Sequence, residues 1–246
     1  KLRDVVSRHL QIGFLIISTT MGLIFALCTP ASAGLVYDDQ IHWERSVKLS
    51  YGSNLDDFSQ GEYDLADLKY MLFDSTSTNF YQTYNTTEDQ ARYHATLSAK
   101  GRELLPIYTQ PHKTDITDIG YVTQSLGIGV ARLMGLPLHW QFIMGRLGNL
   151  TLFIFVGFFA VREAKRYKAI FMIVLLSPMS LLMVGAYTYD PSVIAFCLLG
   201  SSIFITELLT PDKLLNPWRA AVMMAAWAIG SMPKAVYSLL LFLPII

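Results

Sequence analysis

Long apolar stretches separated by polar segments constrain the fold of this chain more than any other feature of its sequence. The first stretch covers residues 10–36, and the clearest of the later ones covers residues 142–161. A helix needs about 20 apolar residues to cross a bilayer. The chain is also 52% hydrophobic and only 15% charged, which is unusual for a soluble domain. The sequence therefore predicts an all-α membrane protein that crosses the bilayer several times.

Basic residues indicate which ends of these stretches face the cytoplasm. Lys1, Arg3 and Arg8 precede the first stretch, and residues 162–168 contain four basic residues directly after the span at 142–161. Because Lys and Arg concentrate in cytoplasmic loops, both clusters place the N-terminus in the cytoplasm. The later stretches would then alternate across the membrane, at residues 169–187, 191–208 and 220–231 and from Ala235 onward.

The two ends of the sequence lead to separate expectations. Residues 1–36 read as a cytoplasmic N-terminus and a first transmembrane helix. Their alternative interpretation is a secretory signal peptide with Ala31-Ser32-Ala33 as its cleavage site. The sequence stops within an apolar run at Pro244-Ile245-Ile246, so we expect the C-terminal part of the protein to be missing.

Residues 37–118 differ from the rest of the chain in composition. They contain 14 acidic and 7 basic residues together with many aromatic ones. We expect them to form a large extracytoplasmic loop or small subdomain, with a surface helix over residues 88–105.

The remaining residues divide into two parts. Residues 119–140 are apolar, but glycines and Arg132 interrupt them, which favours a helix in the outer membrane interface. Residues 141–246 would supply about five transmembrane helices, the last one truncated. Pro178 and Pro233 should kink or break the helices that contain them.

Ionisable residues at the ends of the spans predict one polar site on the extracytoplasmic face. Such residues are costly at a membrane boundary and are usually kept for a function. Threading the spans in order brings all of these positions to the same side of the membrane. The residues are Asp38, Asp39, His42, Arg146, Asp190 and Lys234.

The acidic pair could do two kinds of chemistry. One carboxylate of Asp38 and Asp39 could take a proton from an acceptor hydroxyl, while the other orients the acceptor or holds a divalent cation. His42 would share their face if the segment is helical. The alternative is that the acidic pair only caps a helix. The metal requirement stays open at this point.

The remaining candidates have a binding role and a structural alternative. Lys234 and Arg146 could bind the phosphate of a lipid-linked substrate, or they could extend to the lipid headgroups. Asp190 could supply a further polar contact, although an Asp followed by Pro191 is also an ordinary helix start.

Short segments in a fixed order resemble a bacterial membrane-protein family known as domain of unknown function 2142. The first resembles its Asp-Glu-x-x-His-aromatic motif, with Asp39 at the position of the glutamate. The matching segments are Tyr37-Asp38-Asp39-Gln40-Ile41-His42-Trp43, Gly120-Tyr121-Val122-Thr123-Gln124-Ser125-Leu126-Gly127, Gly145-Arg146-Leu147-Gly148-Asn149-Leu150, Ser177-Pro178-Met179-Ser180, Tyr189-Asp190 and Met232-Pro233-Lys234.

That family resembles the type C glycosyltransferases, polytopic enzymes that use polyprenyl-phosphate-linked sugars. For this chain the resemblance implies a location in the bacterial plasma membrane. The resemblance implies that Asp38 is the catalytic base and that Asp39 orients the acceptor or a metal. It implies Lys234 and Arg146 as ligands of the donor phosphate and Asp190 as a second polar contact. The acceptor would be a cell-envelope polysaccharide or glycolipid.

Two other functions remain as alternatives to a glycosyltransferase. A non-catalytic envelope scaffold would use the outer loop to bind a polymer or partner, and a transporter would move lipid-linked sugars. A transporter needs polar residues along a path through the membrane, whereas the charges here lie at the ends of the spans. The balanced net charge gives no indication of nucleic-acid binding, and the sequence contains no nucleotide-binding loop.

Overall fold

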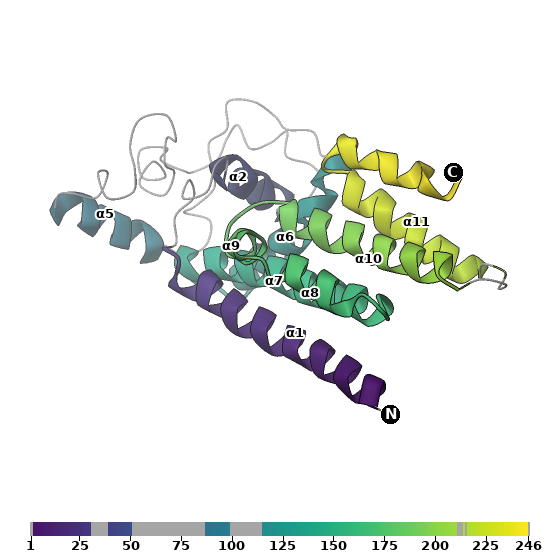
Figure 1. Ribbon diagram of the computed structural model, residues 1–246. Helices are drawn as coiled ribbons and strands as arrows, with labels where there is room; N and C mark the ends of the chain where they lie inside the picture. Colours follow the sequence, from purple (N-terminus) through teal and green to yellow (C-terminus); the bar gives the residue numbers. More distant parts are fainter. Residues whose placement is uncertain are drawn as a thin grey trace.

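The computed structural model describes residues 2–30, 39–50, 87–98, 115–210, 214 and 216–245, and the elements they form are all helices (Figure 1). In chain order these are α1 (Leu2–Cys28), α2 (Asp39–Ser50), α5 (Thr87–Ser98), η3 (Ile116–Tyr121), α6 (Val122–Leu133), α7 (Leu138–Glu163), α8 (Lys168–Leu175), α9 (Pro178–Val184), α10 (Asp190–Leu208), α11 (Pro217–Ser231) and η4 (Ala235–Ile245). The prediction of an all-α chain is confirmed for these residues.

Three of the described helices are long and apolar enough to cross a membrane. They are His9–Cys28 within α1, all of α7 and all of α10. Each covers at least part of a stretch that the sequence predicts as a span. These helices identify the chain as a membrane protein.

The other stretches predicted as spans form shorter helices. Residues 169–187 are divided between α8 and α9, residues 220–231 lie within the 15-residue α11, and the stretch from Ala235 is the 3-10 helix η4. Proline accounts for two of the breaks, because it has no backbone N–H and clashes with the preceding turn. α9 starts at Pro178, where the Ser177 hydroxyl oxygen accepts from the Ser180 N–H at 3.3 Å. α11 ends two residues before Pro233.

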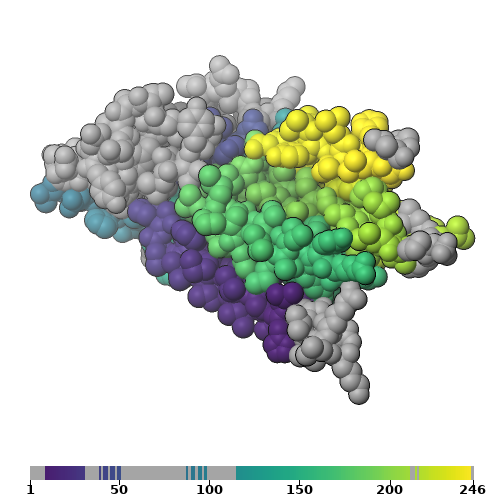
Figure 2. Space-filling model, in the orientation of Figure 1, coloured from purple at the N-terminus to yellow at the C-terminus, as the bar shows by residue number. Residues whose placement is uncertain are grey.

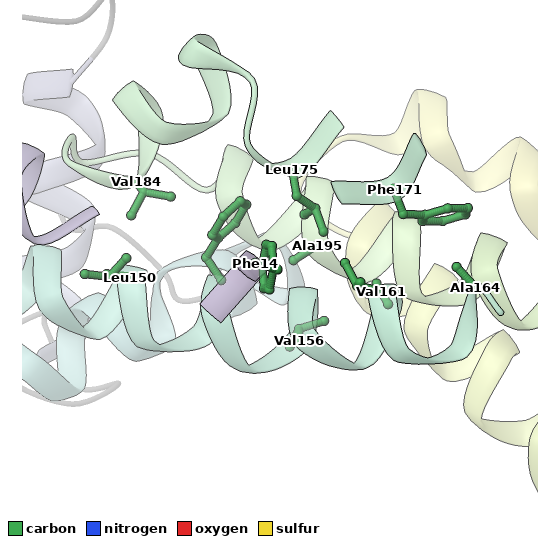
Figure 3. Packing of buried hydrophobic residues seen from close by; sticks show 11 residues of the cluster. Phe14, Leu150, Val156, Val161, Ala164, Phe171, Leu175, Val184 and Ala195 are labelled. Atoms are coloured by element: carbon green, nitrogen blue, oxygen red, sulfur yellow. The ribbon is translucent and has the colours of Figure 1, made fainter. Parts of the chain in front are cut away.

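The core forms where α1 packs against α7, α8 and α9, and α10 packs against the same three helices. Phe14 of α1 is fully buried among Val156, Leu175 and Ala195 (Figure 3). The space-filling view shows α1 lying along one side of the molecule against the green segments α8 and α9 (Figure 2). Such close packing is the main source of association between helices in a bilayer.

Glycines let α6 approach α7 with the two backbones in contact. A Cβ atom at Gly127 would overlap the carbonyl oxygen of Met144, and one at Gly148 would overlap the carbonyl oxygen of Thr123. Small residues at helix interfaces permit this approach in membrane proteins. α6 is therefore held along α7, and this contact fixes the position of the segment predicted as an interfacial helix.

The two ends of the helical bundle carry different residues. At the first, the site end, α1 finishes, α7 and α10 begin and α11 finishes (Figure 1). At the other, the basic end, α7 and α10 finish and α11 begins. An ion-pair network lies there, in which Arg219 pairs with Glu163 at 2.8 Å and with Glu207 at 2.5 Å.

α2 and α5 belong to the predicted extracytoplasmic loop. α2 packs against η3 and α6 at the site end (Figure 1). α5 covers Thr87–Ser98 and overlaps the first part of the helix predicted over residues 88–105. Residues 99–105 lie outside the described part of the chain.

Candidate functional site

Asp39 of the acidic pair opens α2 at the site end. Asp39 is the first residue of α2 and is 1% exposed. Its Oδ1 accepts a hydrogen bond of 2.8 Å from the backbone N–H of Tyr187, in the linker between α9 and α10. Asp38 lies outside the described residues, but the peptide bond places its Cα about 3.8 Å from that of Asp39. Asp39 thus ties the start of α2 to the linker that leads into α10.

Arg146 binds the end of α1, from which the chain continues toward the acidic pair. This α7 side chain is 1% exposed, and its guanidinium donates to the carbonyl oxygens of Thr29 at 2.8 Å and Pro30 at 2.9 Å. The guanidinium also lies 4.6 Å from the centroid of the Phe142 ring. The structure therefore gives Arg146 a role in anchoring the end of α1.

An aromatic cluster forms one turn further along α2. The Nδ1 atom of His42 is hydrogen-bonded to the Tyr121 hydroxyl at 2.6 Å, and the His42 ring meets the Tyr189 ring edge-on at 4.9 Å between centroids. The ring centroids of Tyr121 and Tyr189 lie 5.7 Å apart. Burial raises the pKa of Tyr121 well above its usual value, and the nearby Arg45 charge only partly opposes this. Tyr121 therefore keeps its hydroxyl proton at neutral pH.

Gln124 connects α2 with the linker before α10. The Ser46 hydroxyl donates to Gln124 Oε1 at 2.8 Å, and Gln124 Nε2 donates to the Thr188 carbonyl at 2.6 Å. Gln124 is fully buried, so both bonds are formed away from water. Asn149 of α7 lies on the same linker, with its Nδ2 atom 3.4 Å from the Ala186 carbonyl.

Lys234 and Asp190 form an ion pair at the same end of the bundle. Lys234 Nζ donates to Asp190 Oδ1 at 2.6 Å, and the Thr188 hydroxyl donates to Asp190 Oδ2 at 3.0 Å. Lys234 Nζ also lies 5.3 Å from the centroid of the Tyr189 ring. Burial lowers the pKa of Lys234, but the hydrogen bond to Asp190 and its negative charge raise it by more, so the net shift is upward. Lys234 is therefore a positively charged group at neutral pH.

The structure brings most of the predicted site residues into one network. Asp39, His42, Asp190 and Lys234 are linked through residues 187–189, and Arg146 contacts the end of α1 instead. Sequence reasoning assigned no role to the residues that make these links, which are Ser46, Tyr121, Gln124, Tyr187, Thr188 and Tyr189. Gln124 stands out as an amide within an apolar stretch and could have been identified, whereas Ser46 gives no signal in the sequence.

The described residues contain no group of three or more His, Cys, Asp or Glu side chains that could hold a metal ion. The only metal ligands that the sequence suggested are Asp38 and Asp39, and Asp38 lies outside the described part. What the site offers is a set of carboxylates, a positively charged amine and aromatic rings. Such groups can bind an anion, hold a hydroxyl-bearing molecule and accept a proton.

Comparison with known families shows the family to which the chain belongs. A family model described as "Predicted membrane protein (DUF2142)" matches residues 20–246, nearly the whole chain. No curated protein and no solved structure matches the chain.

Proposed function

We propose that this chain, which belongs to the DUF2142 family of predicted membrane proteins, carries the active site of an inverting glycosyltransferase. The donor is a sugar linked to polyprenyl phosphate in the outer leaflet of the bacterial plasma membrane. The acceptor is a hydroxyl of a cell-envelope polymer or glycolipid on the extracytoplasmic face. The resemblance to type C glycosyltransferases suggests this reaction.

One observation carries the proposal most directly. The Lys234–Asp190 ion pair is joined through Thr188 and Tyr189 to the helix that begins with Asp39. A lipid-linked sugar presents a phosphate and a reacting sugar carbon side by side, so its enzyme needs a cation and a base at one site. Lys234 supplies the cation, and the acidic pair supplies the base.

The reaction has a simple balance of bonds and charges. Asp38 takes the proton of the acceptor hydroxyl. At the same time the hydroxyl oxygen attacks the anomeric carbon from the face opposite the phosphate. The bond between the anomeric carbon and the phosphate oxygen breaks, and the polyprenyl phosphate leaves with a second negative charge. Lys234 stabilises this developing negative charge. An aligned cation stabilises such a charge most strongly in the transition state.

The other site residues have supporting roles in this proposal. Asp39 fixes the start of α2 through Tyr187 and so orients its neighbour Asp38. His42 lies beside Tyr189 and contacts the acceptor, while Asp190 positions Lys234. Arg146 acts indirectly by anchoring the chain that leads from α1 into the acidic pair.

The test compares cells that express the full-length protein or its Asp38→Asn variant at matched membrane levels. Mass spectrometry of envelope glycans and lipid-linked sugars should show one sugar missing from a polymer in the variant, with its polyprenyl-phosphate donor accumulating. The matched control is Glu163→Gln, which removes a carboxylate at the basic end and should leave the glycans unchanged. Unchanged glycans and donor pools in Asp38→Asn would reject the transferase and favour a non-catalytic scaffold.

A further inference from the structure

A cavity of about 210 Å³ lies at the basic end of the bundle, away from the site described above. Lys165, Arg166 and Tyr167 line it from the turn between α7 and α8, and Thr206 and Thr210 line it from the end of α10. We propose that this cavity binds the phosphate group of an anionic lipid headgroup. The inference is independent of the glycosyltransferase proposal.

The cavity lies at the level along the membrane normal where lipid headgroups are expected. α7 and α10 are candidate membrane spans, and they end at Glu163 and Leu208, directly beside the cavity. Leu208 is 70% exposed and the Tyr167 side chain is also exposed. Tyrosine is enriched at the boundary between the apolar and polar parts of a bilayer. The cavity therefore lies where two spans leave the membrane.

The charge of the cavity favours an anion. The Lys165 and Arg166 side chains are exposed, and neither forms an ion pair with any residue that the structure describes. The nearby carboxylates of Glu163 and Glu207 are bound to Arg219 instead. The C-terminal ends of α7 and α10 together contribute roughly one negative charge, which is less than the two positive charges on the lining.

Of the polar side chains that line the cavity, Lys165 and Arg166 are the cations that can donate to a phosphate. The Thr206 hydroxyl donates to the Glu163 carbonyl at 2.7 Å, and the Thr210 hydroxyl donates to the Thr206 carbonyl at 2.7 Å. Their protons are thus already used within the protein. Lys165 and Arg166 have free N–H donors, and basic pockets between transmembrane helices are known to bind lipid phosphates.

The test measures lipid binding to the purified full-length protein in detergent by native mass spectrometry. The probes are phosphatidylglycerol, which is anionic, and phosphatidylcholine, which is zwitterionic. Wild-type protein should retain phosphatidylglycerol preferentially, and Lys165→Gln combined with Arg166→Gln should bind it roughly thirtyfold more weakly. The charge-preserving pair Lys165→Arg and Arg166→Lys should retain the preference, which separates loss of charge from loss of fold.

The matched control is Arg162→Gln. Arg162 belongs to the same basic cluster, but its guanidinium lies 5.9 Å from the Phe159 ring and it is not among the residues lining the cavity. An equal loss of phosphatidylglycerol binding in this control, or no loss in the double variant, would overturn the proposal. A further arm adds inorganic phosphate alone. Retention of phosphate that depends on Lys165 and Arg166, without lipid preference, would overturn the lipid source and assign the cavity to a soluble phosphate.

Discussion

Lys234 is held in place by an acidic partner without losing its capacity to bind an anion. Its ammonium group has three N–H donors, and one of them goes to Asp190. The Thr188 hydroxyl donates to the other oxygen of the same carboxylate. In the proposed mechanism Asp190 is therefore a positioning residue, and the other two N–H donors of Lys234 bind the phosphate.

Replacing Lys234 tests its proposed role in transfer. Lys234→Met removes the charge that stabilises the leaving phosphate, so we expect the transfer rate to fall by about 100-fold or more. Lys234→Arg is the control and should retain a larger part of the activity, because it keeps the charge. The measurement is the rate at which labelled sugar reaches the acceptor in membranes with equal protein levels. Equal rates in Lys234→Met and wild type would remove Lys234 from the mechanism.

The raised pKa of Lys234 predicts a pH dependence of stability. A group whose pKa is higher in the folded state contributes stability below its unfolded pKa and loses it as the pH rises through the folded pKa. The unfolded value for lysine is about 10.4. The difference in thermal stability between wild type and Lys234→Met should therefore be constant from about pH 6 to 9 and shrink only above about pH 10.5. If this stability difference were already lost before the rising pH reached about 9, the result would contradict a charged Lys234–Asp190 pair.

The bond between Tyr121 and His42 makes a separate prediction. Tyr121→Phe removes only the hydroxyl that is bonded to His42 Nδ1. Loss of one such hydrogen bond costs about 1 kcal/mol, which thermal unfolding in detergent can detect. Tyr237→Phe is the control, because the Tyr237 side chain is 41% exposed, and it should leave the stability unchanged. Equal stability of Tyr121→Phe and wild type would mean that the bond contributes nothing.

At the scale of the helices, the contact between α6 and α7 determines where the site residues lie. η3 and α6 carry Tyr121 and Gln124, and the linker before α10 receives the Gln124 hydrogen bond. A shift of α6 away from α7 would therefore separate α2 from that linker. The glycines at this contact are part of what builds the site.

Gly127→Ala should disturb this contact, because its Cβ would overlap the Met144 carbonyl oxygen. Backbone atoms cannot move aside cheaply, and overpacking of this kind typically costs about 1–3 kcal/mol. Gly129→Ala is the matched control on the same helix, since its nearest contact, the Ser50 carbonyl oxygen, is at an ordinary 3.7 Å. Alanine there should be neutral or stabilise the helix. Equal thermal stability of the two variants would contradict the close approach.

The sequence predicted the helices better than it predicted the contacts between them. Apolar length identified α7 and α10, and proline chemistry identified the break before α9, because these properties are local. The bonds from Asp39 to Tyr187 and from Ser46 to Gln124 join residues 148 and 78 positions apart. No local pattern specifies such partners. The order of the predicted spans alone was enough to place Asp190 and Lys234 on the same side of the membrane.

At the scale of the whole molecule, the bundle has two chemically distinct ends. The site end carries Asp39, His42 and the Lys234–Asp190 pair, and the basic end carries Lys165, Arg166 and the Arg219 network. Basic residues favour the cytoplasmic side, so we expect the site end to face outward. An outer-leaflet donor can reach the site only in this orientation.

Cysteine labelling in intact cells tests this orientation. In a background with Cys28→Ser and Cys197→Ser, Ile116→Cys reports on the site end and Leu214→Cys on the loop after α10. Both side chains are well exposed, at 67% and 95%. A membrane-impermeant maleimide should label Ile116→Cys in intact cells and Leu214→Cys only after the membrane is opened. The reverse pattern would place the site in the cytoplasm and exclude an outer-leaflet donor.

The most direct test of the central claim follows phosphorus in the donor lipid. A polyprenyl-phosphate sugar is a phosphodiester, and transfer of the sugar converts it into a phosphomonoester, which ³¹P nuclear magnetic resonance distinguishes whatever the sugar is. Full-length protein in liposomes made from its native lipids and glycans should produce the monoester in wild type and in Glu163→Gln, but not in Asp38→Asn. Monoester formation at the wild-type rate in Asp38→Asn, or none in wild type, would contradict a transferase that uses Asp38 as its base.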